Sequence, residues 1–233
     1  VLCVMGKLSL AHEKIGEGIQ LAIKDKNDWV LGLGYVNHGY VFGQEGNYTR
    51  AHELIQSGLS IYKEIKNLHG VAFALNTLGP ILIQLERFDE ARESLEESLA
   101  LSIQFHDRWG MGMAYGRLGM LALQKGELSN SRTLLKKSLA MFNELGMRWD
   151  TGWALMQLGK VAMASEEWLE AEQLLKRSVK LSLASHAMPQ AIDAALELAD
   201  CLIHQGELIK AKEIILPALD HPVFTSPNSP ATI

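Results

Sequence analysis

Two His-Glu pairs are the residues of this chain most suited to acid–base or metal chemistry. His12-Glu13 and His52-Glu53 lie 40 positions apart, which along a helical path corresponds to about 60 Å of rise. One metal ion cannot bridge that distance. The sequence also has no His-Glu-x-x-His motif, no cysteine pair at ligand spacing and no glycine-rich phosphate loop. We therefore predict no metal, no cofactor and no enzymatic activity.

Three tryptophans are the next candidates, because an arginine over an indole face can recognise a partner. Trp29, Trp109 and Trp149 share one position of the 40-residue spacing, and Arg108 and Arg148 precede the last two. We expect all three in loops between repeats, where tryptophans often wedge one structural repeat onto the next. We favour the wedge interpretation.

These residues are positioned by a repeat of 40 residues that runs through the chain without an insertion. One column holds small residues, at Ala11, Ala51, Ala91, Ser131, Ala171 and Ala211. Another holds Gly39, Gly79, Gly119, Gly159 and Ala199, and a third holds the large apolar residues Leu8, Tyr48, Phe88, Leu128, Trp168 and Leu208. Ser98, Ser138 and Ser178 form a further small column, so they recur without a nucleophile motif.

Apolar residues between these columns recur at intervals of three and four residues, which predicts two amphipathic helices in each repeat. First helices are expected near residues 30–44, 69–85, 109–125, 149–165 and 189–205, and second helices near 47–66, 87–105, 127–145, 167–185 and 207–220. Gly46, Gly126 and Gly206 mark the turns within the pairs, where positive φ is useful. Glu86 and Glu166 occupy the same column, so we expect those two turns to close differently.

The glycine column predicts close helix crossings, because glycine inside a helix costs about 1 kcal/mol against alanine. Gly119→Leu is therefore expected to unfold the middle of the array. An unchanged melting curve would contradict this packing role.

The register of the repeat also predicts how the two ends of the chain are organised. Val1 aligns with positions inside a first helix, so we expect a fragment with a truncated first unit, a repeat domain over 1–220 and a flexible tail over 221–233. Cys3 and Cys201 are too far apart in such a fold to pair, which favours a reducing, cytoplasmic setting.

Composition narrows the classes of function. The charge of −5 comes from interspersed acidic and basic residues, and no basic stripe suits phosphates. The opening run VLCVM lacks the flanks of a signal peptide and is too short to span a bilayer. We predict no direct nucleic-acid binding and no membrane segment. The oligomeric state stays open.

The columns resemble those of tetratricopeptide repeats. The motif residues are Leu75, Leu78-Gly79, Leu82, Ala91, Leu95 and Ser98, and again Leu155, Leu158-Gly159, Ala162, Ala171, Leu175 and Ser178. The unit is 40 residues long instead of the usual 34, and it lacks the proline that often ends a unit in this family. The longer unit, as in LEESLALSIQFHDRWGMGMAYGRLG, is similar to the helical sensor regions of maltose-regulon-type transcription activators and bacterial signalling ATPases. The resemblance implies an all-α, right-handed superhelical solenoid of antiparallel helix pairs.

By the same resemblance, the first helices line a concave groove. The groove positions would be Leu33, Val36, Tyr40, Phe73, Asn76, Ile83, Met113, Met120, Trp153, Met156, Lys160 and Met163, with the amides of Gln44, Gln84 and Gln124 beside them. A methionine- and aromatic-rich groove suits an amphipathic helix or an apolar ligand. The same residues could instead pack between successive repeats, and the residues alone leave both interpretations open.

Two classes of function follow. The leading hypothesis is an interaction, sensor or scaffold module that binds a peptide, helix or partner domain within a larger transcriptional or signalling regulator. The alternative is a small-molecule effector domain of such a regulator. A segment that only spaces or dimerises a larger protein is a third possibility, under which Met113→Glu leaves all binding intact.

Overall fold

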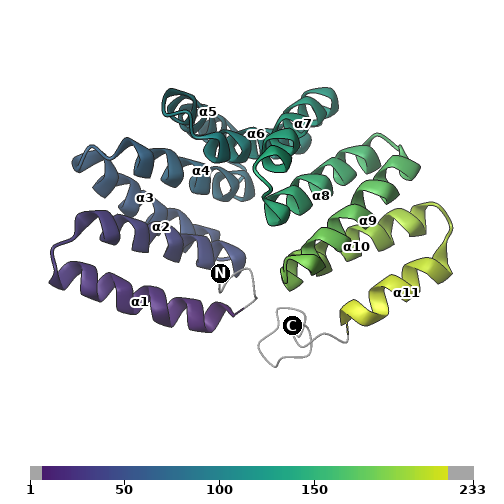
Figure 1. Ribbon diagram of the computed structural model, residues 1–233, viewed down its shortest axis with the longest axis horizontal. Helices are drawn as coiled ribbons and strands as arrows, with labels where there is room; N and C mark the ends of the chain where they lie inside the picture. Colours follow the sequence, from purple (N-terminus) through teal and green to yellow (C-terminus); the bar gives the residue numbers. More distant parts are fainter. Residues whose placement is uncertain (1–6, 220–233) are drawn as a thin grey trace. The chain divides into compact units, whose positions relative to one another are not determined.

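The computed structural model describes residues 7–219, and this range contains eleven α-helices and no β-strand (Figure 1). The helices are α1 (Leu8–Lys24), α2 (Asp28–Gln44), α3 (Tyr48–Glu64), α4 (Leu68–Gln84), α5 (Phe88–Gln104), α6 (Arg108–Gln124), α7 (Leu128–Glu144), α8 (Arg148–Ala164), α9 (Trp168–Ala184), α10 (Met188–His204) and α11 (Leu208–Leu219). The predicted helices are confirmed to within a few residues.

All ten loops between these helices have three residues and the same turn. The middle residue of each loop has positive φ, at Lys26, Gly46, Lys66, Glu86, His106, Gly126, Gly146, Glu166, His186 and Gly206. The expectation that the turns at Glu86 and Glu166 close differently is therefore wrong. Their φ values are 58° and 59°, so the backbone accepts the left-handed conformation without glycine, at a cost of about 1–2 kcal/mol.

The hydrogen bonds of the loops explain why this conformation is kept. In the loop after α4, the Arg87 N–H donates to the Leu82 carbonyl at 2.9 Å and the Glu86 N–H donates to Ile83 at 3.0 Å. This is the Schellman arrangement, which satisfies carbonyls that the helix end would otherwise leave without partners. The loop after α2 makes the same two bonds with Gly46 in the middle.

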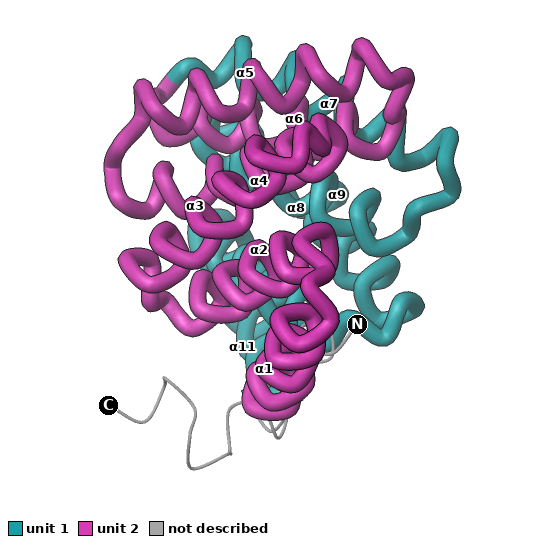
Figure 2. Tube along the Cα trace, turned by 90° about the vertical axis from the view of Figure 1, so that its left-hand side faces the viewer, with its two compact units in different colours: residues 1, 3–6, 127–233 teal, residues 2, 7–126 magenta. Residues whose placement is uncertain are grey.

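The helices form two compact units, an N-terminal unit of residues 7–126 and a C-terminal unit that begins at residue 127 (Figure 2). In both units the even-numbered helices are the first helices of the repeats and the odd-numbered helices are the second. First helices also contact one another, α2 with α4 and α4 with α6 in the N-terminal unit, and α8 with α10 in the C-terminal unit.

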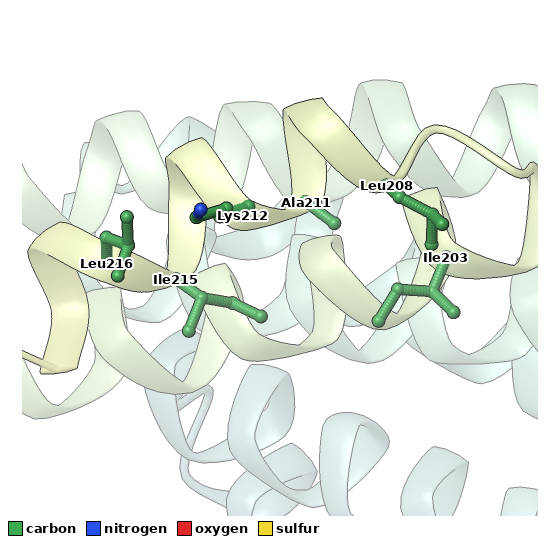
Figure 3. A pocket seen from close by; sticks show the side chains of 6 residues that line it. All are labelled: Ile203, Leu208, Ala211, Lys212, Ile215 and Leu216. Carbon is green, nitrogen blue, oxygen red and sulfur yellow. The ribbon is translucent and has the colours of Figure 1, made fainter.

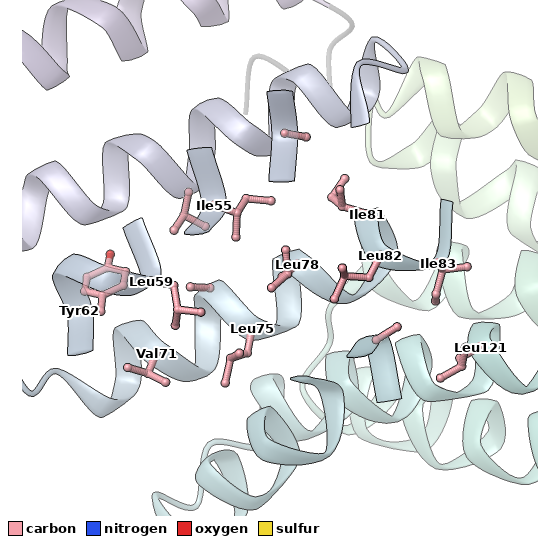
Figure 4. Packing of buried hydrophobic residues seen from close by; sticks show 14 residues of the cluster. Ile55, Leu59, Tyr62, Val71, Leu75, Leu78, Ile81, Leu82, Ile83 and Leu121 are labelled. Carbon is pink, nitrogen blue, oxygen red and sulfur yellow. The ribbon is translucent and has the colours of Figure 1, made fainter. Parts of the chain in front are cut away.

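The core of the N-terminal unit lies between its two layers of helices. Ile55, Leu59 and Tyr62 from α3 meet Leu75 and residues further along α4 (Figure 4). The crossings are tight. A Cβ at Gly79 would lie 2.4 Å from the Leu95 side chain of α5, a distance that real Cβ atoms essentially never show. At Gly39 the nearest atoms would be Ile55 at 2.6 Å and the Ala51 carbonyl at 2.8 Å, which confirms the packing role of the small columns at these crossings.

The serine column contributes more than small size. The Ser98 hydroxyl donates to the Ala72 carbonyl of α4 at 2.8 Å, and the Ser178 hydroxyl donates to the Gly152 carbonyl of α8 at 2.7 Å. Both serines are fully buried. Each bond joins a second helix to the first helix before it, a role that the sequence columns do not reveal.

The core of the C-terminal unit is built from smaller residues. Leu175 of α9 packs with Leu198, Ala199 and Leu202 of α10, and Trp153, Met163 and Trp168 cover the cluster from its partly exposed side. Gly159 again sits at a crossing, where a Cβ would lie 2.7 Å from Leu175.

Several sequence expectations fall outside residues 7–219. They are the placement of Val1 inside a helix, the pairing state of Cys3, the tail over 221–233 and the ends of the predicted domain over 1–220, and all stay predictions. None of the helices between residues 7 and 219 combines the length and apolar character needed to cross a membrane.

Candidate binding surface on the first helices

The fourteen predicted groove residues divide by burial into those that pack and those that solvent reaches. Val36, Asn76, Ile83 and Met156 are buried. The Asn76 amide donates to the Gly110 carbonyl of α6 at 3.4 Å, so this side chain joins two first helices. For these four residues the packing interpretation holds, and a partner cannot reach them in this conformation.

In the N-terminal unit, the remaining predicted residues are partly exposed. Leu33 of α2, Phe73 of α4 and Met120 of α6 rest with one side on the buried core and keep the other side open. Tyr40 and Met113 are also partly exposed. Gln84 and Gln124, together with Gln44, are exposed at the last residue of each first helix. The first-helix face of this unit is therefore an apolar surface bordered by amides.

In the C-terminal unit the same column changes character. Trp153 and Met163 of α8 lie partly exposed against the core. The Lys160 ammonium of α8 forms an ion pair with Glu197 of α10 at 2.7 Å. The next member of the Leu33, Phe73, Met113, Trp153 column is Asp193, which solvent reaches. The surrounding protein raises the pKa of Asp193 by desolvation, Glu197 raises it further, and Lys160 opposes both.

Sequence reasoning missed these acidic residues, although the register contains the signal. Adding 40 to Trp153 gives Asp193 directly. Glu197 follows one turn later on α10, and Leu196 beside it stays exposed. This column is thus apolar on α2, α4, α6 and α8 and carries a carboxylate, Asp193, on α10.

The tryptophan column only partly fits the wedge interpretation. Trp109 and Trp149 are partly buried, and the Trp149 carbonyl accepts a hydrogen bond from the Gln190 amide at 3.1 Å. Trp29 keeps 52% of its surface exposed. At Trp29 the indole therefore does not act as a buried wedge.

One histidine cluster was not expected from the sequence. His12 of α1 and His38 of α2 approach to 2.9 Å between ring nitrogens, and the other nitrogen of His12 lies 3.0 Å from the Glu45 carboxylate. Phe42 packs against both rings. Desolvation by burial, and then the nearby His12 and Arg50, lower the pKa of His38, and Glu45 opposes them. Each ring nitrogen of His12 already faces a protein group, and residues 7–219 contain no group of three ligands arranged for a metal.

The architecture defines a class of protein, the helical-repeat solenoid, in which paired helices stack on their neighbours. Models of the tetratricopeptide repeat match residues 31–104, and again residues 76–145 and 156–211. The chain belongs to the tetratricopeptide-repeat family, whose members are typically non-catalytic modules for protein interaction and scaffolding. A search of curated proteins found no match.

Solved structures share the fold at low sequence identity. BtubC from P. vanneervenii is 16% identical over 92% of this chain and 89% of its own, with a TM-score of 0.67. A Rap protein complexed with Competence and Sporulation Factor is 13% identical over 84% of this chain and 54% of its own, with a TM-score of 0.73. A putative kinesin light chain from Podosopora anserina, with nearly identical TPR-like repeats, is 18% identical over 82% and 94%, with a TM-score of 0.59.

Proposed function

We propose that the first-helix surface of this protein binds a peptide or helix of a partner protein, and that the chain serves as a sensor or scaffold part of a larger transcriptional or signalling regulator. The observation that carries the proposal is the partly exposed apolar column, with Leu33, Phe73 and Met113 in one unit and Trp153 in the other. These side chains stay open to solvent on helices that are otherwise the most buried of the fold. Partly exposed apolar residues at one position of successive first helices, such as Leu33, Phe73 and Met113 within the N-terminal unit, are typical of interaction sites.

The chemistry of the surface favours a particular kind of partner. In the N-terminal unit, the exposed glutamines offer donors and acceptors to a bound backbone. In the C-terminal unit, Trp153 and Asp193, which share one column of the repeat, suit a segment that carries a basic side chain. The Rap protein complexed with Competence and Sporulation Factor is a member of the same fold that holds a binding partner, which is consistent with this assignment.

The test is partner capture with matched variants. Met113→Glu places a charge in the apolar column, whereas Ile103→Glu places the same charge on an exposed site of a second helix. We expect wild type and Ile103→Glu to retain a partner that Met113→Glu loses. Retention by all three would contradict the proposal and favour a spacer role. A large thermal stabilisation by one metabolite, abolished by Met113→Glu, would favour a small-molecule effector domain instead.

A further inference from the structure

One column of the second helices changes its chemistry along the chain. It follows the small column of Ala11 and Ala51 by one residue, and its members are His12, His52, Arg92, Arg132, Glu172 and Lys212. Lys212 lines an apolar cavity together with Ile203 (Figure 3). Polar contacts with the next helix pair are made by His12, His52, Arg132 and Glu172. We call each of these contacts a junction, because it ties one helix pair to the next.

The junction at Arg132 joins α7 to the next pair through ionised groups. The Arg132 guanidinium donates to the Glu170 carboxylate at 2.8 Å and also pairs with Glu167. Arginine is not deprotonated in proteins, and the bond to Arg132 holds the pKa of Glu170 below its usual range. Mild acid therefore leaves the charges of this junction unchanged.

The junction at His52 joins α3 to the turn before α5, and it depends on a neutral ring. The Arg87 guanidinium lies 3.1 Å from the Nε2 of His52. Because arginine has donors and no acceptor, Arg87 donates and this nitrogen accepts with its lone pair. Protonation of His52 places a proton on the same nitrogen, removes the acceptor and brings two cations into contact. The junction at His52 therefore exists only while the ring is neutral.

The charges around His52 act in both directions. Arg87 also donates to Glu90 through two nitrogens, at 2.7 and 2.6 Å, and Glu53 is the neighbour of His52 on α3. Burial, and then Arg87, lower the pKa of His52, whereas Glu90 and Glu53 oppose them. The neutral ring that the geometry requires is therefore also the form that the surroundings favour.

The junction at His12 has a similar requirement. The Nδ1 of His12 lies 2.9 Å from the Nε2 of His38, and the Nε2 of His12 donates to the Glu45 carboxylate at 3.0 Å. Two ring nitrogens in contact share one proton and not two, so at most one of these rings is protonated while the contact holds. Arg50 of α3 is a further positive charge that acts on His38. A second proton on the pair therefore separates the rings.

We propose that mild acid opens the junctions at His12 and His52, whereas the junction at Arg132 stays closed, so that the N-terminal unit is a pH-sensitive segment of the array. Histidine suits this role because its charge changes near physiological pH. The apolar core still joins the helix pairs of this unit, so acid loosens their stacking without unfolding them. The device does not depend on what the first helices bind. If they bind a partner as proposed, looser stacking changes the spacing of Leu33 and Phe73 and makes binding depend on pH.

Hydrogen exchange of the full chain tests the opening, because it reports the local loss of protection helix by helix. Exchange is measured at about pH 7.5 and about pH 5.5, on either side of the ordinary histidine pKa of about 6.5, and is corrected for the intrinsic effect of pH. Helices α1 to α5 of the wild type should lose about fivefold in protection on acidification, whereas α7 to α9 should change less than about twofold.

A double variant removes the titration and keeps the contacts. In His38→Gln/His52→Gln, each glutamine has an amide that can donate or accept at both pH values, so the protection of α1 to α5 should change less than about twofold. His106→Gln is the matched control, because His106 is exposed in the loop after α5 and lies outside the column. This control should respond to acid as the wild type does. So should Met113→Glu, which separates this proposal from partner binding by the first helices.

Titration of the histidine rings by NMR tests the junction at His52 directly. Arg87→Gln removes the facing cation, so His52 should titrate at a higher pH in this variant than in the wild type. This measurement decides the matter even where the double variant does not fold.

The proposal is wrong if the wild type and the double variant lose equal protection in acid. It is also wrong if α7 to α9 lose as much protection as α1 to α5, which would indicate a general destabilisation by acid. Titration of His52 at the same pH in Arg87→Gln and in the wild type would likewise overturn it.

Discussion

The first and second helices of the repeats have the same length and are joined by the same kind of loop, yet they differ in how many of their sides are buried. α4 contains no charged residue and buries residues on almost every side, because it packs between α3 and α5 and against other first helices. α5 carries six charged residues and buries a single stripe of Ala91, Leu95, Ser98 and Ser102. A helix that is apolar all round belongs to an inner layer, and one with a single apolar stripe belongs to an outer layer.

The difference teaches where function can reside in such a fold. On second helices, solvent-facing positions tolerate change because little depends on them. On first helices, a side chain that stays open to solvent is an exception among buried neighbours. The partly exposed Phe73, Met113 and Trp153 are therefore more informative than the more exposed Ile103 of a second helix.

The largest expected effect contrasts two glycines. Gly79 on first helix α4 has no room for a Cβ, whereas Gly18 on second helix α1 has no neighbouring atom within 4 Å of that position. Gly79→Leu should destabilise the N-terminal unit by about 3 kcal/mol through overpacking. Gly18→Ala should stabilise it by up to about 1 kcal/mol, because alanine is the better helix former.

Thermal melts followed by circular dichroism, with hydrogen exchange to localise the change, measure both variants. If both substitutions changed the free energy of unfolding in the same direction, the distinction between inner and outer layers would be contradicted.

The next effect separates the two faces of the second helices. Ser178→Ala removes a buried bond to the Gly152 carbonyl of α8 and should cost about 0.5–1.5 kcal/mol, because a hydrogen bond between two helices is lost. Ser57→Ala is the control, since the Ser57 hydroxyl bonds to the exposed Glu53 carbonyl within its own helix. Its expected cost is below about 0.5 kcal/mol. Chemical denaturation compares them, and similar losses would mean that the inter-helix bond contributes nothing.

The sequence predicted the helices well, because the columns record helix contacts that repeat in register. Small residues at Gly39 and Ala51 predicted a crossing that the structure contains. The sequence did not predict the turns at Glu86 and Glu166. Residue type indicates which φ values are low in energy, whereas the hydrogen bonds of the loop decide which φ is adopted.

The binding surface was less accessible to sequence reasoning. Val36 and Phe73 are both apolar residues on first helices, yet one is buried and the other partly open. Burial depends on the angle of the neighbouring helix and on the size of its side chains, which periodicity does not contain. The close approach of His12 and His38 has the same origin, since it joins residues that no column relates.

A smaller effect tests the turns. Glu86→Gly keeps the left-handed conformation and removes its strain, so it should stabilise the N-terminal unit by up to about 1 kcal/mol. Gly46→Ala imposes that strain on a loop with φ of 80° and should destabilise it by about 1 kcal/mol. Paired melts of the two variants measure the effects. A loss of stability in Glu86→Gly would show that the glutamate side chain, and not only the backbone, closes the turn.

The smallest expected effect concerns pH and the one polar member of an inner-layer column. His38 stands where the other repeats have Leu78, Leu118, Leu158 and Leu198. Its pKa in the folded chain is lowered, chiefly by burial and then by His12 and Arg50, against the opposing Glu45. Below the ordinary histidine pKa of about 6.5, the unfolded chain therefore binds protons more readily than the folded chain does.

The free energy of unfolding should accordingly fall as the pH drops below this value and stay level above it, as far as His38 is concerned. His38→Leu restores the residue of the other repeats and should flatten the fall. Urea unfolding of both proteins at a series of pH values from neutral into the acid range measures the slopes. An unchanged slope in His38→Leu would assign the pH dependence to other groups, of which His52 is the first to examine, because burial lowers its pKa as well.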